Sequence, residues 1–204
     1  MIDDLDLFRD LVETLLKEED KEPVLKPEAP DVLFKRLQIE LGEQGVGEEA
    51  FAQILKDLIL STPRTATRRF FNQLFGGRNS KATLGDLLAV ILNNSMYTYK
   101  VGGPMVGVEK EVLKKSAALL GYPKEADGTL APGGSMTNFM AMLMARDKAQ
   151  EQGRTQGLDG RKLCLYTSKE SHYSIPKNAA FMGVGRDQIR YIESDARGQM
   201  RPDR

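Results

Sequence analysis

A pair of glycines directly before a strongly amphipathic segment constrains this sequence most. Pro132-Gly133-Gly134-Ser135 is followed by apolar residues at the helical spacing i, i+3, i+4, i+7 and i+8, namely Met136, Phe139, Met140, Leu143 and Met144. The spacing predicts a helix that begins at the glycines and runs to about residue 152. Such a helix start gathers free backbone N–H groups at the positive end of the helix dipole, and Ser135 adds a hydroxyl. A phosphate can be held there without a charged side chain.

The same pattern also has a simpler interpretation. Gly-Gly-Ser before a helix is more often only a turn and an N-cap. Neither of the two familiar glycine-rich nucleotide motifs, G-x-x-x-x-G-K-[ST] and G-x-G-x-x-G, occurs in the sequence. The local pattern alone therefore leaves both interpretations open.

An alternation of strands and helices follows. We predict a buried strand over 162–168, a helix over 173–182 and a strand over 189–192, and the short apolar segment 129–131 precedes the glycine pair. This order predicts parallel α/β crossovers, whose ligands bind at the carboxyl ends of the strands. Gly134, Ser135 and His172, the only histidine of the chain, are predicted to lie at that edge.

The first third of the chain is predicted to be helical. Apolar stripes indicate helices over 4–18, 31–41 and 48–60, with Asp31 as a cap for the second. Stripes joined by such short proline- and glycine-containing loops cannot bury one another fully, so at least one is expected to pack on something else. Further helices are predicted over 84–96 and 108–120.

Charge and cysteine content limit the classes of partner. The chain has 29 basic and 29 acidic residues, so no overall field favours nucleic acid or an anionic membrane. Its single cysteine, Cys164, lies in the predicted buried strand, which excludes an intramolecular disulfide and favours a reducing compartment. The acidic start lacks the features of a signal peptide, and the longest aliphatic run, 87–92, is too short to span a bilayer. We expect a cytoplasmic protein that binds neither nucleic acid nor membrane, and we assign no metal ligands.

Four collinear segments carry a family resemblance. They are residues 69–77 (Arg-Phe-Phe-Asn-Gln-Leu-Phe-Gly-Gly), 94–101, 127–138 (Asp-Gly-Thr-Leu-Ala-Pro-Gly-Gly-Ser-Met-Thr-Asn) and 166–185, which contains His172-Tyr173-Ser174. In these segments the chain resembles the group II pyridoxal-phosphate-dependent amino-acid decarboxylases. It is most similar to the branch with glutamate, cysteine-sulfinate and aspartate decarboxylases, over roughly residues 64–202.

The resemblance implies a fold and a domain organisation. The fold is α/β: a fold-type I large domain of the pyridoxal-phosphate-dependent transferase kind, with a parallel-rich sheet and flanking helices, here incomplete and preceded by a helical arm. We expect the arm to span 1–62 and the large domain 63–204. In the family such an arm contributes to the interface of a homodimer.

The resemblance also implies roles for individual residues. Gly134 and Ser135 would bind the phosphate of pyridoxal 5'-phosphate, and His172 would stack on its ring and act in catalysis. Asn72 and Gln73 would face the carboxylate of an acidic amino-acid substrate. Where relatives commonly have His-Pro before Arg-Phe-Phe, this chain has Thr67-Arg68, so the local turn is left open.

The lysine that links covalently to the cofactor follows a histidine in relatives, and no His-Lys pair occurs here. Lys169 and Lys177 match non-catalytic positions. We therefore expect the N-terminal part of a longer enzyme, inactive alone, with the remainder of that enzyme and a second subunit as partners. Two alternatives stay open: a decarboxylase of aromatic or diamino acids, and a truncated, non-catalytic module for phosphate binding or assembly.

Overall fold

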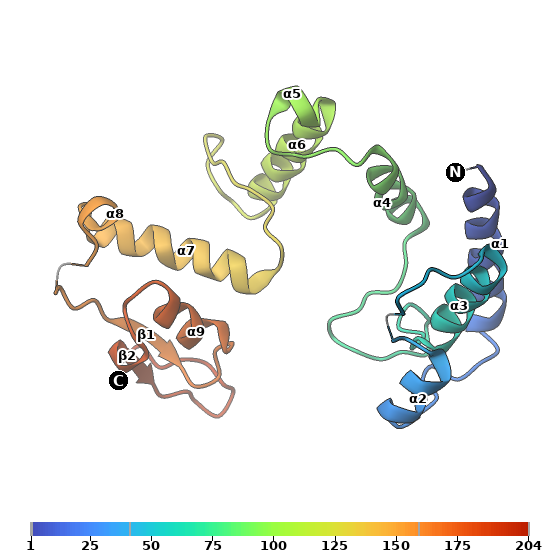
Figure 1. Cartoon of the computed structure of the whole chain (residues 1–204). Helices are drawn as coiled ribbons and strands as arrows, with labels where there is room; N and C mark the ends of the chain where they lie inside the picture. Colours follow the sequence, from blue (N-terminus) through green and yellow to red (C-terminus); the bar gives the residue numbers. More distant parts are fainter. Residues whose placement is uncertain (1, 41, 159, 204) are drawn as a thin grey trace. The chain divides into compact units, whose positions relative to one another are not determined.

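The computed structural model describes residues 2–40, 42–158 and 160–203. The chain divides into two compact units, residues 1–94 and residues 95–204 (Figure 1). The division into an arm over 1–62 and a large-domain part over 63–204 stays a prediction.

The first unit is helical. It contains α1 (Ile2–Glu19), α2 (Pro30–Leu37), α3 (Glu48–Ser61) and α4 (Ser80–Leu92), with α3 packed on both α1 and α2 (Figure 1). No residue of α2, α3 or α4 is buried. Phe8 on α1, Phe34 on α2 and Phe51 on α3 are 44%, 51% and 47% exposed. The prediction that these stripes cannot bury one another fully is confirmed.

The limits of two helices in the first unit differ from the predicted ones. Asp31 does not cap α2, because the helix already begins at Pro30, whose missing N–H and fixed φ suit the first helical position. That helix ends at Leu37, where Gln38 adopts the left-handed conformation; Leu41 lies outside the described residues. Helix α4 begins at Ser80 because the Asn79 side chain accepts hydrogen bonds from the amides of residues 81 and 82.

The second unit contains the sheet. Its helices are α5 (Tyr99–Gly102), α6 (Pro104–Leu119), α7 (Gly134–Ala149), α8 (Gly153–Gln156), α9 (Ser174–Phe181) and the short 3-10 helix η1 (Arg186–Gln188). Strands β1 (Leu165–Ser168) and β2 (Ile189–Ile192) pair in parallel, with Leu165 opposite Ile189 and Ser168 opposite Ile192. The chain runs from β1 through α9 to β2, the predicted crossover (Figure 1).

The buried apolar residues of the described chain lie on α9, in the turn after it and at the start of β2. They are Ala179, Met182, Val184 and Ile189. Helix α9 also packs against α7. The helix that begins at the glycine pair is therefore held against the β1–α9–β2 crossover. This packing positions the two sequence segments that carry the candidate site.

The short apolar segment before the glycine pair, which the expected alternation of strands and helices would make the first strand of the sheet, is not a strand in the structure. Segment 129–131 pairs with no strand, and the sheet has the order β1-β2. Strand β1 also begins at Leu165, later than predicted, so Cys164 is exposed rather than buried. A strand of a parallel sheet is buried only when other strands and helices cover it. The prediction that Cys164 is buried assumed such neighbours.

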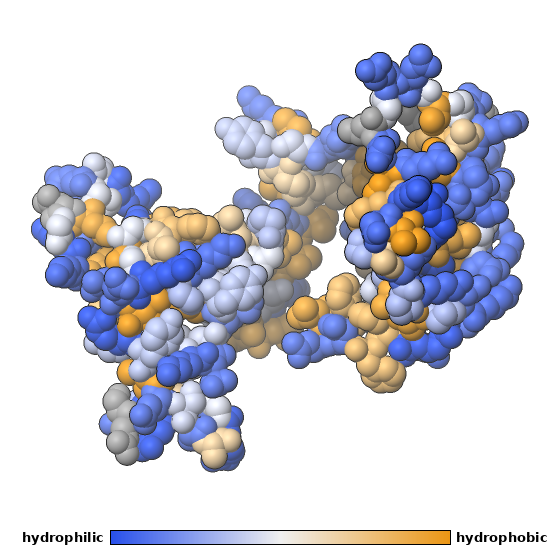
Figure 2. All heavy atoms as spheres, turned by 60° about the horizontal axis from the view of Figure 1, so that its bottom comes forward, coloured by the Kyte–Doolittle hydropathy of each residue, from blue (hydrophilic) through white to orange (hydrophobic). Residues whose placement is uncertain are grey.

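Both units leave extensive apolar surface open. The chain exposes 17009 Å², whereas two separate compact domains of these sizes would together expose about 11500 Å². Figure 2 shows apolar side chains lying open on the face in view. Helix α4 is the strongest case, with Leu84, Leu88, Val90 and Ile91 all more than half exposed. Among the described residues, no helix is both long and apolar enough to cross a membrane.

Candidate functional site

The start of α7 is an open, glycine-built helix terminus. Gly133 precedes the helix with φ 103°, a conformation that favours glycine, and no side chain caps this end. The carbonyl of Gly133 accepts hydrogen bonds from the amides of Met136 at 3.0 Å and Thr137 at 3.2 Å. The amides of Gly134 and Ser135 belong to the first turn, which has no acceptor within the helix. A Cβ added to Gly134 would meet nothing within 4 Å, so the helix start is open beside this residue.

Side-chain hydrogen bonds fix this helix start against α9. Asn178 donates to the backbone carbonyl of Ser135 at 3.0 Å, and Asn138 donates to the hydroxyl of Ser174 at 2.9 Å. Asn178 and Ser174 are buried, at 3% and 0% exposure. Farther along α7, Arg146 donates to the carbonyl of Met182 at the end of α9. Three separate links therefore hold the two helices in register.

His172 lies at the start of α9 and joins this network. Its Nδ1 is 2.9 Å from the Ser174 hydroxyl and accepts the Ser174 backbone N–H at 3.2 Å. The imidazole is exposed, and its centroid is 4.2 Å from that of the Tyr173 ring. Through Ser174 and Asn138, the structure connects His172 to the helix that begins at Gly134 and Ser135. The sequence predicted these three site residues, and the structure brings them into one hydrogen-bonded part of the second unit.

A cluster of hydroxyls at the end of β1 supports the His172 loop. Thr167 donates to the Ser171 hydroxyl at 2.7 Å, and the Ser168 hydroxyl lies 3.3 Å from the same oxygen. Sequence reasoning missed this cluster and also missed Asn138 and the Ser174/Asn178 pair. The available signal was the placement of Ser174 and Asn178 four residues apart, which puts two polar side chains on one face of a predicted helix.

Asn72 and Gln73 lie in the first unit, in the exposed loop between α3 and α4. The Asn72 side chain accepts the Leu74 amide at 2.8 Å, and Phe70 packs edge-on against Phe75 with centroids 5.5 Å apart. Gln73 is exposed. The Asn72 side chain therefore shapes its own turn.

The same loop is anchored to the end of α1 and to its own start. Arg69 donates to the carbonyls of Glu19 and Glu22, each at 2.7 Å, and Arg78 forms two hydrogen bonds of 3.0 Å to the Glu19 carboxylate. At the predicted departure from the family pattern, Thr67 is buried, and its hydroxyl donates to the carbonyl of Arg64 at 3.0 Å. Thr67 thus makes a stable turn without the usual His-Pro.

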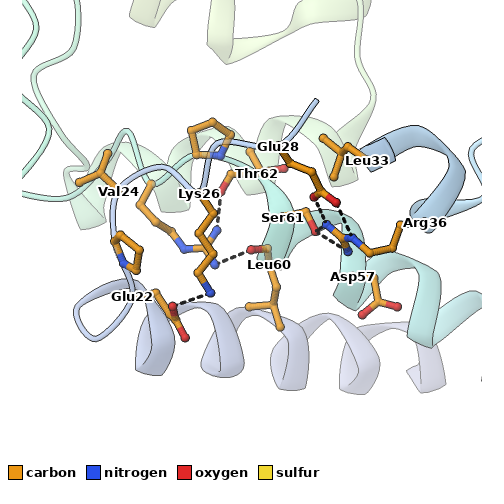
Figure 3. Close-up of a pocket in the computed structure, with 13 residues that line it drawn as sticks. Glu22, Val24, Lys26, Glu28, Leu33, Arg36, Asp57, Leu60, Ser61 and Thr62 are labelled. Carbon is orange, nitrogen blue, oxygen red and sulfur yellow. Dashed lines mark hydrogen bonds and ion pairs between the residues drawn. The ribbon is translucent and has the colours of Figure 1, made fainter. Parts of the chain in front are cut away.

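A cavity of about 380 Å³ lies between the loop before α2 and the end of α3 in the first unit (Figure 3). Arg36 binds Glu28 with hydrogen bonds of 2.7 and 3.3 Å, and Lys26 contacts Glu22 at 2.6 Å. These hydrogen bonds hold the pKa of both carboxyl groups below their usual values. The cavity includes none of the predicted site residues. Arg36 and Lys26 are paired with carboxylates, and the guanidinium of Arg64 donates to backbone carbonyls at the end of α3. The two basic side chains of this cavity that form ion pairs are therefore already neutralised by carboxylates of the first unit.

The described residues contain no group of three or more His, Cys, Asp or Glu side chains arranged to hold a metal ion.

Comparisons with known proteins agree on one family. The model of the pyridoxal-dependent decarboxylase conserved domain matches residues 30–204. Mouse (Mus musculus) cysteine sulfinic acid decarboxylase is 40% identical over 183 residues, which cover 89% of this chain and 37% of that protein. An acidic amino acid decarboxylase from cattle (Bos taurus) is 38% identical over 193 residues, covering 94% of this chain and 37% of that protein. The crystal structure of mouse CSAD matches with a TM-score of 0.92 and 37% identity, covering 100% of this chain and 44% of that one.

Proposed function

Because this chain belongs to the family of pyridoxal-dependent decarboxylases, we propose that it is the N-terminal part of an enzyme that releases CO₂ from the α-carboxylate of an acidic amino acid. The chain spans about 37% of the length of the curated relatives it matches. The observation that carries the proposal is the glycine-built start of α7, hydrogen-bonded through Asn138 and Ser174 to His172. Activity, substrate and assembly belong to the longer protein.

The start of α7 fits the phosphate of pyridoxal 5'-phosphate. The amides of Gly134 and Ser135 have no acceptor within the helix, the Ser135 hydroxyl is adjacent, and the space beside Gly134 is open. Backbone N–H groups at a helix N-terminus bind phosphate through hydrogen bonds and the helix dipole. Gly134 and Ser135 therefore bind the phosphate in the proposed enzyme.

His172 provides a flat, exposed imidazole beside this terminus. Its Nδ1 is engaged by Ser174, and the rest of the ring is available to lie against the cofactor and help position the bond that breaks. When bound, pyridoxal 5'-phosphate supplies the electron-withdrawing ring that stabilises negative charge at the substrate α-carbon. The residues of this chain bind and orient the cofactor. The lysine that attaches covalently to the cofactor lies elsewhere in the enzyme.

The substrate class rests on the Asn72-Gln73 segment and on the relatives. Gln73 extends from a loop that Arg69 and Arg78 anchor to α1, and its exposed amide can donate to a carboxylate. Relatives with 37–40% identity over most of this chain are called cysteine sulfinic acid or acidic amino acid decarboxylases. Glutamate, aspartate and cysteine sulfinate are the candidate substrates.

The assembly is a homodimer of the longer enzyme in the cytoplasm. The exposed apolar residues of α4 and the partly exposed stripes of α1, α2 and α3 support burial against other parts of the protein.

Two experiments test the function. Mass spectrometry of the polypeptide purified from its source shows whether the longer protein exists. That protein, supplied with pyridoxal 5'-phosphate, is then assayed for CO₂ release from the three acidic amino acids and, as the competing class, from aromatic and diamino acids. We expect release from an acidic substrate only, and His172→Ala should lower turnover far more than it lowers cofactor content. Release mainly from an aromatic or diamino acid contradicts the proposal.

A further inference from the structure

We propose that Ser174 and Asn138 are positioning residues that hold the neutral His172 ring as a single tautomer, with the proton on Nε2. The inference rests on three hydrogen bonds that converge on one edge of the ring. That His172 serves a cofactor is part of the proposed function. The tautomer itself follows from the geometry of this chain alone.

The backbone supplies the first constraint. The Ser174 amide lies 3.2 Å from Nδ1 of His172 with hydrogen-bond geometry, and a backbone N–H can only donate. Nδ1 must therefore present its lone pair in the neutral ring, which places the proton on Nε2.

The Ser174 hydroxyl supplies the second constraint. Its oxygen is 2.9 Å from Nδ1 and accepts a hydrogen bond from the Asn138 side chain, also at 2.9 Å. Ser174 is fully buried, so no bulk water competes for the hydroxyl. With Asn138 donating to the oxygen, the hydroxyl hydrogen is free to point toward Nδ1, where it adds a second donor to the same acceptor.

Asn138 thereby connects the ring to the phosphate-binding helix. It lies on α7, four residues after Gly134, and Asn178 ties the same helix to α9 through the Ser135 carbonyl. Nε2 of His172 forms no hydrogen bond with any described residue. The network therefore leaves a proton-bearing nitrogen on the free edge of the ring, and two hydrogen bonds connect this ring to the helix that would bind the cofactor phosphate.

Nitrogen NMR of ¹⁵N-histidine tests the proposal directly, because His172 is the only histidine of the chain and its signals need no assignment. At about pH 9, above the ordinary titration range of imidazole, we expect one nitrogen with a pyridine-like shift and one with a pyrrole-like shift, without averaging. The correlation pattern to the ring protons identifies the pyrrole-like nitrogen as Nε2. The same chain in urea gives the averaged reference.

Substitutions separate the two positioning residues. Asn138→Asp replaces the donor with an acceptor that draws the Ser174 hydroxyl away from the ring, so the two nitrogen shifts should move clearly toward each other. Ser174→Ala removes the hydroxyl but keeps the backbone donor, so a smaller movement in the same direction is expected. Ser116→Ala is the matched control: it deletes a serine hydroxyl that bonds the Val112 carbonyl on α6, and should leave both shifts unchanged.

The experiments distinguish a failure of this inference from a failure of the proposed function. Averaged shifts in the folded wild-type chain, or shifts that Asn138→Asp leaves in place, overturn the inference even if the longer enzyme decarboxylates acidic amino acids. A fixed Nε2–H tautomer supports it even if the enzyme acts on another substrate. The same measurement is made on the longer enzyme, where the resonances lost in His172→Gln are those of His172. Averaged shifts there overturn the inference whatever the isolated chain shows.

Discussion

Arg78 and Glu19 form a two-pronged ion pair across 59 residues of sequence, with both guanidinium–carboxylate distances at 3.0 Å. The Glu19 side chain is 14% exposed and that of Arg78 is 35% exposed, so the pair is partly shielded from water. It closes the loop that carries Asn72 and Gln73 onto the end of α1, where Arg69 binds the carbonyls of Glu19 and Glu22. The helical arm thus holds the proposed substrate loop in place.

Arg78→Ala should loosen this loop. Loss of a two-pronged, partly shielded ion pair is expected to cost about 1 kcal/mol of local stability. Hydrogen exchange of the amides in 70–79 should accelerate, while that of β1 and α9 stays unchanged. Arg68→Ala is the control, because Arg68 is exposed in the same loop and forms no ion pair with a described residue. Equal exchange rates in the two variants would show that the ion pair does not anchor the loop.

The ion pair between Glu28 and Arg36 predicts a pH dependence. The hydrogen bond from Arg36 lowers the pKa of Glu28, so the carboxylate stabilises the fold above about pH 4.3, the ordinary value for glutamate. This stabilisation is lost as the pH falls through the lower pKa of the folded state. The difference in thermal midpoint between wild type and Glu28→Gln should therefore be positive near neutral pH and vanish under acidic conditions. Glu43→Gln, in an exposed loop, should show no such dependence; a constant Glu28→Gln difference at all pH values would contradict the prediction.

The sequence was informative where a pattern is local. The stripe from Met136 to Met144 predicted α7, and the helix does begin at Gly134. Apolar runs predicted β1, α9 and β2 in order, with the parallel pairing that the crossover requires. Together with the family match, this confirms the predicted fold class, the α/β fold-type I decarboxylases.

The sequence was less informative where the outcome depends on partners or on caps. Segment 129–131 was expected to form a strand, and Cys164 was expected to be buried in one. A strand forms only beside another strand, and no described strand pairs with either of them. Asp31 was favoured as a cap because acidic residues cap helices well, yet Pro30 allowed α2 to begin earlier. The link between Asn138 and Ser174 joins positions 36 residues apart, and no local pattern encodes which of several polar residues will meet.

The phosphate-binding role of α7 can be tested at Ser135. In the longer enzyme, Ser135→Ala should weaken the affinity for pyridoxal 5'-phosphate by about 1 to 2 kcal/mol, the usual cost of losing a hydrogen bond to a charged group. The measurement is a titration of cofactor into apoenzyme. Thr155→Ala, which removes a hydroxyl on α8 that bonds the Gln152 carbonyl, is the control. Unchanged cofactor affinity in Ser135→Ala would remove the basis for this site.

The final prediction concerns the 204-residue chain alone. The outer edges of β1 and β2 pair with no described strand, and α4 exposes apolar side chains on several sides. Unpaired strand edges and open apolar surface favour association, so the isolated chain should self-associate or require the remainder of the enzyme for stability.

The isolated chain should also release no CO₂ from any acidic amino acid. It contains no His-Lys pair, and Lys169 and Lys177 are exposed lysines near His172 that the family resemblance assigns to non-catalytic positions. Pyridoxal 5'-phosphate can then be held only through its phosphate and ring, so borohydride treatment followed by digestion should yield no stoichiometric lysine adduct. Sedimentation analysis checks the association, with the longer enzyme as positive control for adduct and activity. A specific adduct at Lys169 or Lys177 together with CO₂ release would mean that these residues complete an active site by themselves.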